Sequence, residues 1–530
     1  MKKFFNKAKS QLQEFQDASS SQKPIPQQNQ QNVIHPPTSE DVIKYRYHHG
    51  VNLGSVFVLE KWLFSDMFID QAPGDSELDA VTAHLKAHGL DQTRQKWENH
   101  WANAVSDQDW EFISREGKCT SIRLPIGYFT LGEEFCKGTP FEKVGGVYTN
   151  AWSAVTNLVS KARSYNIGVL IDLHALPGGA NSDAHSGSST GKPELWSSKT
   201  NLERSRKALV QIASSIRGMP GVIGLQLVNE AVYDAKGMYS WYEDIIQDVS
   251  KVDDSLPIYI SDAWNLNRAL EWTNKRHVFN NTPRNPVIID THKYYTFSDK
   301  DRSQSPPQII SRIPSELTEL DGKAGSLADK GEAQLIIGEY SCVLDGKTWD
   351  RSRPEEKDPL VQQFGHAQSQ KWQEKAGGSY FWTWKMQWMD GGEWGFVEQS
   401  KKRNILPPQS LTLPAQEVQS RIQYAQGRRQ ELHHQARGGH EGYWNQTSPG
   451  KQFQHELYSE GWDTGFSDAQ AFFGMRSQQS SGAEGGDKLG MLEVWIKKRL
   501  LESGRRGEFV WEWEQGFRAG VGAFYSAAGI

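Results

Sequence analysis

Eight short apolar runs recur between residues 45 and 384, and longer segments with helical spacing separate them. Runs rich in Leu, Val and Ile are typical of strands that are buried on both faces. Alternation of such strands with helices predicts an α/β fold with a parallel sheet. In chain order the runs are residues 48–52, 119–125, 168–174, 222–230, 258–262, 287–292, 334–339 and 380–384.

Nearly every run has a polar or aromatic residue at or near its end, namely Asn52, Arg123, His174, Glu230, Asp262, His292, Glu339 and Trp382. A doubly wound sheet does not bring eight such ends to one place. A closed barrel does, because all its parallel strands deliver their C-terminal ends to the same rim. We therefore predict a (β/α)8 barrel with its chemistry on that rim.

The pattern changes after residue 408, where apolar residues take up helical spacing. We predict a barrel domain over residues 43–408 and a helical C-terminal extension of unknown role over residues 409–530. His433, His434 and His440 lie in this extension. They have no cysteine or acidic partner at ligand spacing, so we predict no metal there.

Residues 1–42 form a third part. Its start combines apolar residues at helical spacing with lysines, which predicts a short basic amphipathic helix, and residues 19–31 form a Ser/Gln/Pro-rich flexible tether. Such a helix is able to make weak contact with an anionic membrane surface, or to dock on its own protein. The start lacks the apolar stretch of a secretory signal, and the three cysteines are odd in number and scattered. Both features predict a cytoplasmic protein.

Composition narrows the choice of partner. The net charge is -5, without a broad basic field, so we expect no nucleic-acid partner. The 20 Trp residues favour a sugar ligand, because aromatic faces are platforms for pyranose rings.

Two runs end at a glutamate, Glu230 and Glu339. Paired carboxylates that flank one bond are what glycoside hydrolysis requires, since one protonates the leaving oxygen and the other acts as the nucleophile. This chemistry needs no cofactor and no metal.

The chain resembles glycoside hydrolase family 5, in particular the fungal exo-β-1,3-glucanases, and more closely an intracellular branch of that type than the secreted members. The resemblance covers roughly Tyr45 to Phe396. The residues that carry it are 50–54, 58–60, 123–127, 172–174, 177–178, 229–230, His292 with Tyr294, 338–339 and 381–385.

The resemblance implies that Glu230 is the general acid/base and Glu339 the nucleophile. Such an acid needs a raised pKa, which burial and a nearby negative nucleophile provide, whereas the nucleophile must stay ionised. An arginine that ends a buried strand is costly unless it meets a carboxylate, so we predict that Arg123 contacts Glu339.

The resemblance assigns further substrate-binding residues. Asn229 is expected to bind the sugar 2-hydroxyl, and His174 and His292 to hold sugar hydroxyls or the carboxyl group of the acid. Tyr294 is expected to donate its phenol to Glu339. Trp382 is expected to form the floor under the sugar, and Glu60 on the first loop is a weaker candidate for binding hydroxyls.

Two positions depart from the family pattern. His49 stands where many relatives have arginine, and His185 stands where an asparagine often precedes Ser-Gly in the loop after the third strand. The second change lies near the substrate and leaves the linkage preference open. The leading hypothesis is a retaining β-glucosidase acting on β-1,3-glucan or related β-glucosides from the non-reducing end. The alternatives are a steryl or glycolipid β-glucosidase, and a non-catalytic carbohydrate-binding protein on a barrel scaffold.

Overall fold

The computed structural model describes residues 32–279, 281–321, 327, 330–479 and 483–530. Its centre is a closed barrel of eight parallel strands in chain order, with β8 paired to β1. This confirms the predicted (β/α)8 barrel. The strands are β1 His48–Asn52, β2 Ser121–Gly127, β3 Gly168–Ala175, β4 Val222–Gln226, β5 Ile258–Ser261, β6 Val287–Tyr295, β7 Gln334–Leu344 and β8 Gly378–Phe381.

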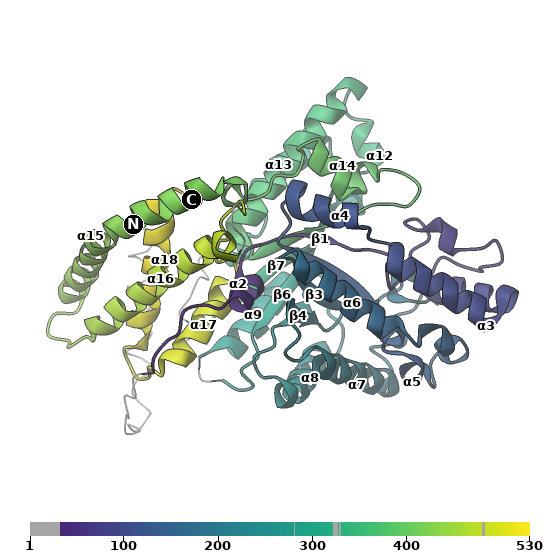
Figure 1. Ribbon diagram of the computed structural model, residues 1–530, viewed down its shortest axis with the longest axis horizontal. Helices are drawn as coiled ribbons and strands as arrows, with labels where there is room; N and C mark the ends of the chain where they lie inside the picture. The colour runs from purple at the N-terminus through teal and green to yellow at the C-terminus, as the bar shows by residue number, and fades with distance from the viewer. Residues whose placement is uncertain (1–31, 280, 322–326, 328–329, 480–482) are drawn as a thin grey trace.

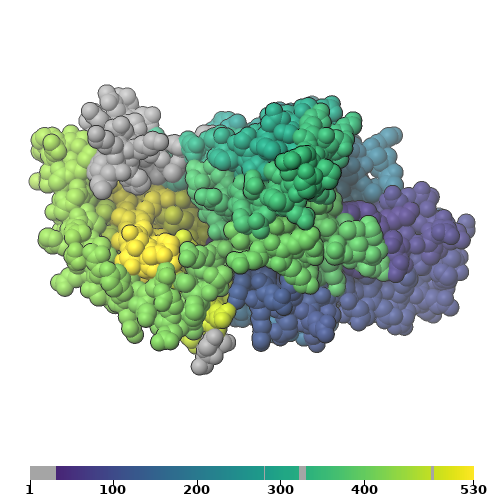
Figure 2. Space-filling view, turned by 90° about the horizontal axis from the view of Figure 1, so that it is seen from above, coloured from purple at the N-terminus to yellow at the C-terminus, as the bar shows by residue number. Residues whose placement is uncertain are grey.

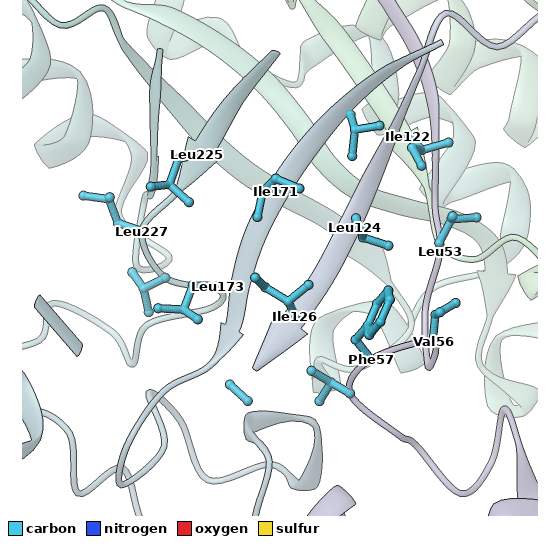
Figure 3. Packing of buried hydrophobic residues seen from close by; sticks show 14 of the residues in the cluster. Leu53, Val56, Phe57, Ile122, Leu124, Ile126, Ile171, Leu173, Leu225 and Leu227 are labelled. Atoms are coloured by element: carbon cyan, nitrogen blue, oxygen red, sulfur yellow. The ribbon is translucent and has the colours of Figure 1, made fainter. Parts of the chain in front are cut away.

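Helices surround the barrel (Figure 1). Alternate residues of each strand face them, as Ile122, Leu124 and Ile126 do on β2 (Figure 3), and this produces the larger hydrophobic core. The principal helices are α2 Ser39–Tyr45, α3 Glu77–Asn103, α4 Asp107–Glu111, α6 Ala151–Ser164, α7 Lys199–Ile216, α8 Met238–Val252, α9 Leu266–His277, α13 Lys357–Lys375 and α14 Phe396–Lys401.

The alternate strand residues that face the interior of the barrel form two layers, one apolar and one polar. Towards the start of the strands the layer is apolar, with Leu170, Tyr259, Ile288, Ile336 and Tyr380 all buried. Two residues further along the strands the layer is polar, and its side chains hydrogen-bond to one another across the barrel. The polar layer therefore lies under the C-terminal rim, where the predicted site residues gather.

Four long helices form the C-terminal region, which confirms the predicted helical extension. They are α15 Ala415–Thr447, α16 His455–Gln479, α17 Leu492–Ser503 and α18 Val510–Ala528. Helices α16 and α18 approach each other closely at glycines: a Cβ added to Gly461 would lie 1.9 Å from the carbonyl oxygen of Trp513. These helices lie to one side of the barrel (Figures 1 and 2), and their apolar residues join the apolar layer of the barrel in one core.

A buried ion cluster ties this region to the start of the barrel. Arg46, just before β1, lies 3.2 Å from Asp487, and Arg476 of α16 reaches the same carboxylate at 2.9 Å. The backbone joins in, because the amide of Tyr47 donates to the carbonyl of Lys488 at 2.7 Å. The residues that lead into the first strand are thus held by the C-terminal part of the chain.

The predicted amphipathic helix and tether lie in residues 1–31, outside the described residues. Their membrane contact and the cytoplasmic location stay predictions. In the described part of the chain, every helix falls short of the length and apolar character that a membrane crossing needs.

Candidate active site

Glu230 and Glu339 meet at the C-terminal rim of the barrel. One carboxylate oxygen of each lies within 4.8 Å of the other, and the same distance limit includes a ring nitrogen of His292. Both glutamates were predicted to end strands, and the structure differs slightly on this point. Strand β4 ends four residues before Glu230, and β7 continues past Glu339 to Leu344.

A β-bulge turns Glu339 towards the barrel axis. The pairing of β6 with β7 runs Thr291 to Ile337 and then His292 to Glu339, so Gly338 is the extra residue. Only glycine fits there, because an added Cβ would lie 1.9 Å from Oδ1 of Asp290. Without the bulge, alternation along the strand would point Glu339 away from the site.

Arg123 occupies the centre of the polar layer and is completely buried. Its Nη1 lies 3.0 Å from Oε1 of Glu339, which is the contact that the sequence predicted. Its Nη2 lies 3.0 Å from Asp172 and 2.7 Å from the side-chain oxygen of Asn229. The guanidinium therefore holds the nucleophile candidate and the residue before the acid candidate in one rigid frame.

We expect Arg123→Met to lower the free energy of unfolding by about 3–5 kcal/mol, because it would leave the carboxylates of Asp172 and Glu339 buried without their cation. Urea denaturation measures this. Arg115→Met is a matched control, since Arg115 is 79% exposed in a surface ion pair, and it should change stability by less than about 1 kcal/mol. Similar losses in the two variants would contradict the assigned role of Arg123.

His292 and Tyr294 extend from β6 over the glutamate pair. The Nδ1 of His292 lies 2.7 Å from Oε1 of Glu230 and 3.5 Å from Oε2 of Glu339, and its Nε2 lies 3.2 Å from Asp290. The hydroxyl of Tyr294 donates to Oε2 of Glu339 at 2.8 Å. Of the two expectations for His292, the structure shows contact with the acid's carboxyl group.

Asn229, His174 and Trp382 lie beside the pair. The Nε2 of His174 is 3.3 Å from Nδ2 of Asn229, and its Nδ1 is 2.7 Å from Asp172. The ring of Trp382 lies parallel to that of His174 with the centroids 6.0 Å apart. Both ring nitrogens of His174 thus have partners other than Glu230, and its contacts orient Asn229 and border the tryptophan face.

Glu60 stands apart from the hydrogen bonds that join the other predicted residues. Its Oε2 accepts a hydrogen bond from the indole of Trp62 at 2.8 Å, and no hydrogen bond joins it to the other eight predicted residues. Burial raises its pKa, and the charges of His185 and His174 oppose that rise. The structure thus places Glu60 near the site but outside its hydrogen-bond network.

The surroundings of Glu230 and Glu339 shift their pKa values opposite to the expected order. Burial raises the pKa of Glu230, but the hydrogen bonds and charges of His185 and His292 outweigh it, so this pKa lies well below its usual range. Burial also raises the pKa of Glu339, where the negative charge of Glu230 adds to the rise. Burial lowers the pKa of both imidazoles, but nearby carboxylates outweigh it, so both pKa values lie well above the ordinary value; these carboxylates are Asp183 and Glu230 for His185, and Glu339, Asp290 and Glu230 for His292. The two imidazoles beside Glu230 therefore favour its ionised form.

Several residues of the polar layer were missed as site residues. Gln226 links Arg123, at 2.9 Å, to Asp290, at 2.7 Å, and Asp290 in turn contacts His292. A signal for Asp290 exists, since it lies two residues before His292 and must share its face of the strand. Asp172 stands in the same relation to His174.

Two groups of side chains place three potential metal ligands within 4.8 Å in the described residues. One is Glu230 with His292 and Glu339. In the other, His440 and His455 lie 2.9 and 2.8 Å from one oxygen of Glu512, an acidic partner that comes from another helix and was not apparent in the sequence. Hydrogen bonds within each group account for its closeness without an ion.

Comparison with known proteins agrees with this geometry. Residues 83–386 match the family model described as cellulase (glycosyl hydrolase family 5), which is more than half of the chain. The chain belongs to glycoside hydrolase family 5. Residues 425–528 of this glycoside hydrolase match a second model, described as the glucan 1,3-beta-glucosidase 3 C-terminal domain.

Relatives of the family 5 chain are similar along nearly its whole length. An uncharacterized glycosyl hydrolase of Saccharomyces cerevisiae is 33% identical over 497 residues, which cover 91% of this chain and 92% of the relative. Glucan 1,3-beta-glucosidase 3 of Schizosaccharomyces pombe is 31% identical over 487 residues, covering 91% and 95%. Among solved structures, rutinosidase from Aspergillus niger shares the fold, with a TM-score of 0.50 and 18% identity over 69% of this chain and 99% of that one.

Proposed function

We propose that this glycoside hydrolase is a retaining β-glucosidase that removes glucose from the non-reducing end of β-1,3-glucan. The closeness of Glu230 and Glu339, whose oxygens lie within 4.8 Å, carries the retaining mechanism. Retaining enzymes hold the two carboxyl groups about 5–5.5 Å apart, and inverting enzymes about 6.5–9.5 Å apart. The substrate is proposed from the similarity to glucan 1,3-beta-glucosidase 3 of Schizosaccharomyces pombe.

In this mechanism Glu339 attacks the anomeric carbon while Glu230 gives its proton to the leaving oxygen. A glucosyl ester on Glu339 results, and water then hydrolyses it after Glu230 takes a proton from that water. Arg123 and Tyr294 each hydrogen-bond one oxygen of Glu339 and so fix its attacking direction. We assign binding of the 2-hydroxyl to Asn229 and support of the sugar ring to the face of Trp382.

Exposed aromatic residues around Trp394, beside Tyr294, support a sugar rather than a lipid as the substrate's leaving group. Trp62 is 38% exposed, Phe297 61% and Trp388 59%. Trp62 and Phe297 both contact the ring of Trp394, at 5.5 and 6.3 Å between centroids, and Tyr294 contacts the same ring at 5.7 Å. Exposed aromatic faces suit the rings of glucan, whereas a sterol or acyl chain requires an open apolar groove.

The proposal is tested by the configuration of the first product. We expect proton NMR of a laminarin oligosaccharide digest to show β-glucose first, with α-glucose appearing later through mutarotation, because double displacement retains the anomer. Initial α-glucose would contradict the mechanism. Early release of glucose alone supports attack from the chain end, and early mixed oligosaccharides would show internal cleavage.

The alternatives are separated by substrate. Turnover of glucosyl-lipid or steryl glucoside without turnover of laminarin oligosaccharides would replace the glucan proposal with the lipid one. Sugar binding without measurable hydrolysis of any β-glucoside would favour the non-catalytic alternative.

A further inference from the structure

The loop after β3 holds the backbone of Glu230. This glutamate has φ of +42°, in the left-handed region that a non-glycine residue occupies at a cost of about 1–2 kcal/mol. The Nδ2 of Asn181 donates to its carbonyl oxygen at 3.1 Å. The other end of the same amide is also occupied, because Oδ1 of Asn181 accepts from the backbone amide of Asp183 at 3.0 Å. Asn181 therefore connects the turn at Asp183 to the strained backbone of Glu230.

The same loop also reaches the carboxyl group. His185 lies in a short 3-10 turn, Ala184–Ser186, and its Nε2 is 3.3 Å from Oε2 of Glu230. The carboxylate of Asp183 lies 3.8 Å from the same nitrogen. The Nδ1 of His185 is buried and has no hydrogen-bond partner in the described residues, so its interactions with charged groups are made through Nε2.

The two oxygens of Glu230 thus have different neighbours. His292 takes Oε1 at 2.7 Å, a short contact that leaves this oxygen unsuited to deliver a proton to substrate. Oε2 is the remaining oxygen, and its longer contact with His185 leaves room for a leaving oxygen. His292 and His185 hold the two carboxyl oxygens of Glu230, and Asn181 holds its backbone carbonyl. Together these contacts fix the orientation of the carboxyl group.

We propose that Asn181 and His185 are positioning residues for the acid: Asn181 fixes the backbone of Glu230, and His185 directs Oε2 towards the leaving oxygen. This inference rests on the proposed function. It gives a role to the histidine that departs from the family pattern, because an imidazole can hold the carboxylate as a cation whereas an amide cannot. The raised pKa of His185 agrees with such an ion pair.

Substrates whose leaving groups differ in their need for protonation test the proposal. A dinitrophenolate departs without protonation, whereas a sugar alcohol needs the acid. For Asn181→Ala and His185→Ala we expect kcat/KM to fall about 10- to 100-fold on laminaribiose and less than about 3-fold on 2,4-dinitrophenyl β-glucoside. His185→Asn, which keeps a donor, should recover part of the laminaribiose loss. Ser182→Ala is the matched control, because Ser182 is exposed in the same loop, and we expect it to match the wild type on both substrates.

Each result decides a different question. A wild-type protein inactive on both substrates would reject the proposed function. An active wild type whose variants lose equally on both substrates, or lose nothing, would reject the positioning role, since damage to the fold does not depend on the leaving group. If Asn181→Ala does not fold, His185→Ala decides alone, because this side chain retains 18% exposure and belongs to a rim loop.

Discussion

Replacing Glu339 with alanine should lower kcat/KM by at least about 10^4-fold on every β-glucoside, good leaving group or poor, because the variant lacks the group that bonds to the anomeric carbon. Removing this carboxylate also removes its electrostatic repulsion with Glu230. We therefore expect the variant to keep its fold. Circular dichroism checks this. Glu355→Ala is a suitable control, since it removes a carboxylate that is 67% exposed in a surface ion pair and should leave activity unchanged.

Azide distinguishes the nucleophile from other essential groups. It is small enough to enter the space that the side chain of Glu339 leaves and to attack from the same face. With 2,4-dinitrophenyl β-glucoside, we therefore expect Glu339→Ala to produce α-glucosyl azide, after a single displacement. Formation of β-glucosyl azide by this variant would show that the two glutamates have the opposite roles.

Replacing Glu230 with alanine should produce a loss that depends on the leaving group. On laminaribiose we expect kcat/KM to fall about 10^2- to 10^4-fold, the usual contribution of general acid catalysis. On 2,4-dinitrophenyl β-glucoside the loss in kcat/KM should be small, because no proton is needed for departure. Azide should then intercept the glucosyl ester on Glu339 and produce β-glucosyl azide, the anomer opposite to that from Glu339→Ala.

These two variants test the roles against the order of the two pKa values. The pKa of Glu230 is lowered and that of Glu339 raised, opposite to the order needed for an acid and a nucleophile. As the acid, Glu230 must carry a proton before Glu339 attacks, and bound substrate favours the protonated form by excluding water from the carboxyl group. An inverted azide pattern would reverse the assigned roles of the two glutamates.

Much of the barrel could be predicted from the sequence, because its signal is local. A run of Leu, Val and Ile reports a buried strand wherever it occurs, and the eight predicted runs overlap the eight strands. The contact between Arg123 and Glu339 could also be predicted from the sequence. A buried charge requires a partner of opposite sign, and few of the predicted strands end at a carboxylate.

Other features of the site depend on geometry that residue types do not encode. The bulge at Gly338 and the left-handed backbone of Glu230 both redirect a side chain without a distinctive local pattern. The contact of His185 with Glu230 depends on the course of the long segment between β3 and β4. Likewise, Glu512 joins His440 across 72 residues, and only packing of the helices brings them together.

The bridge from Arg46 and Tyr47 to Asp487 and Lys488 has a consequence for biosynthesis. The residues that precede the first strand leave the ribosome early, but their partners are synthesised more than 400 residues later. A nascent barrel must therefore wait, with its apolar lower layer uncovered, until translation is almost complete. We expect chaperone dependence to be greatest in that interval, and ribosome-bound chains that stop before residue 487 to be more sensitive to protease than released ones.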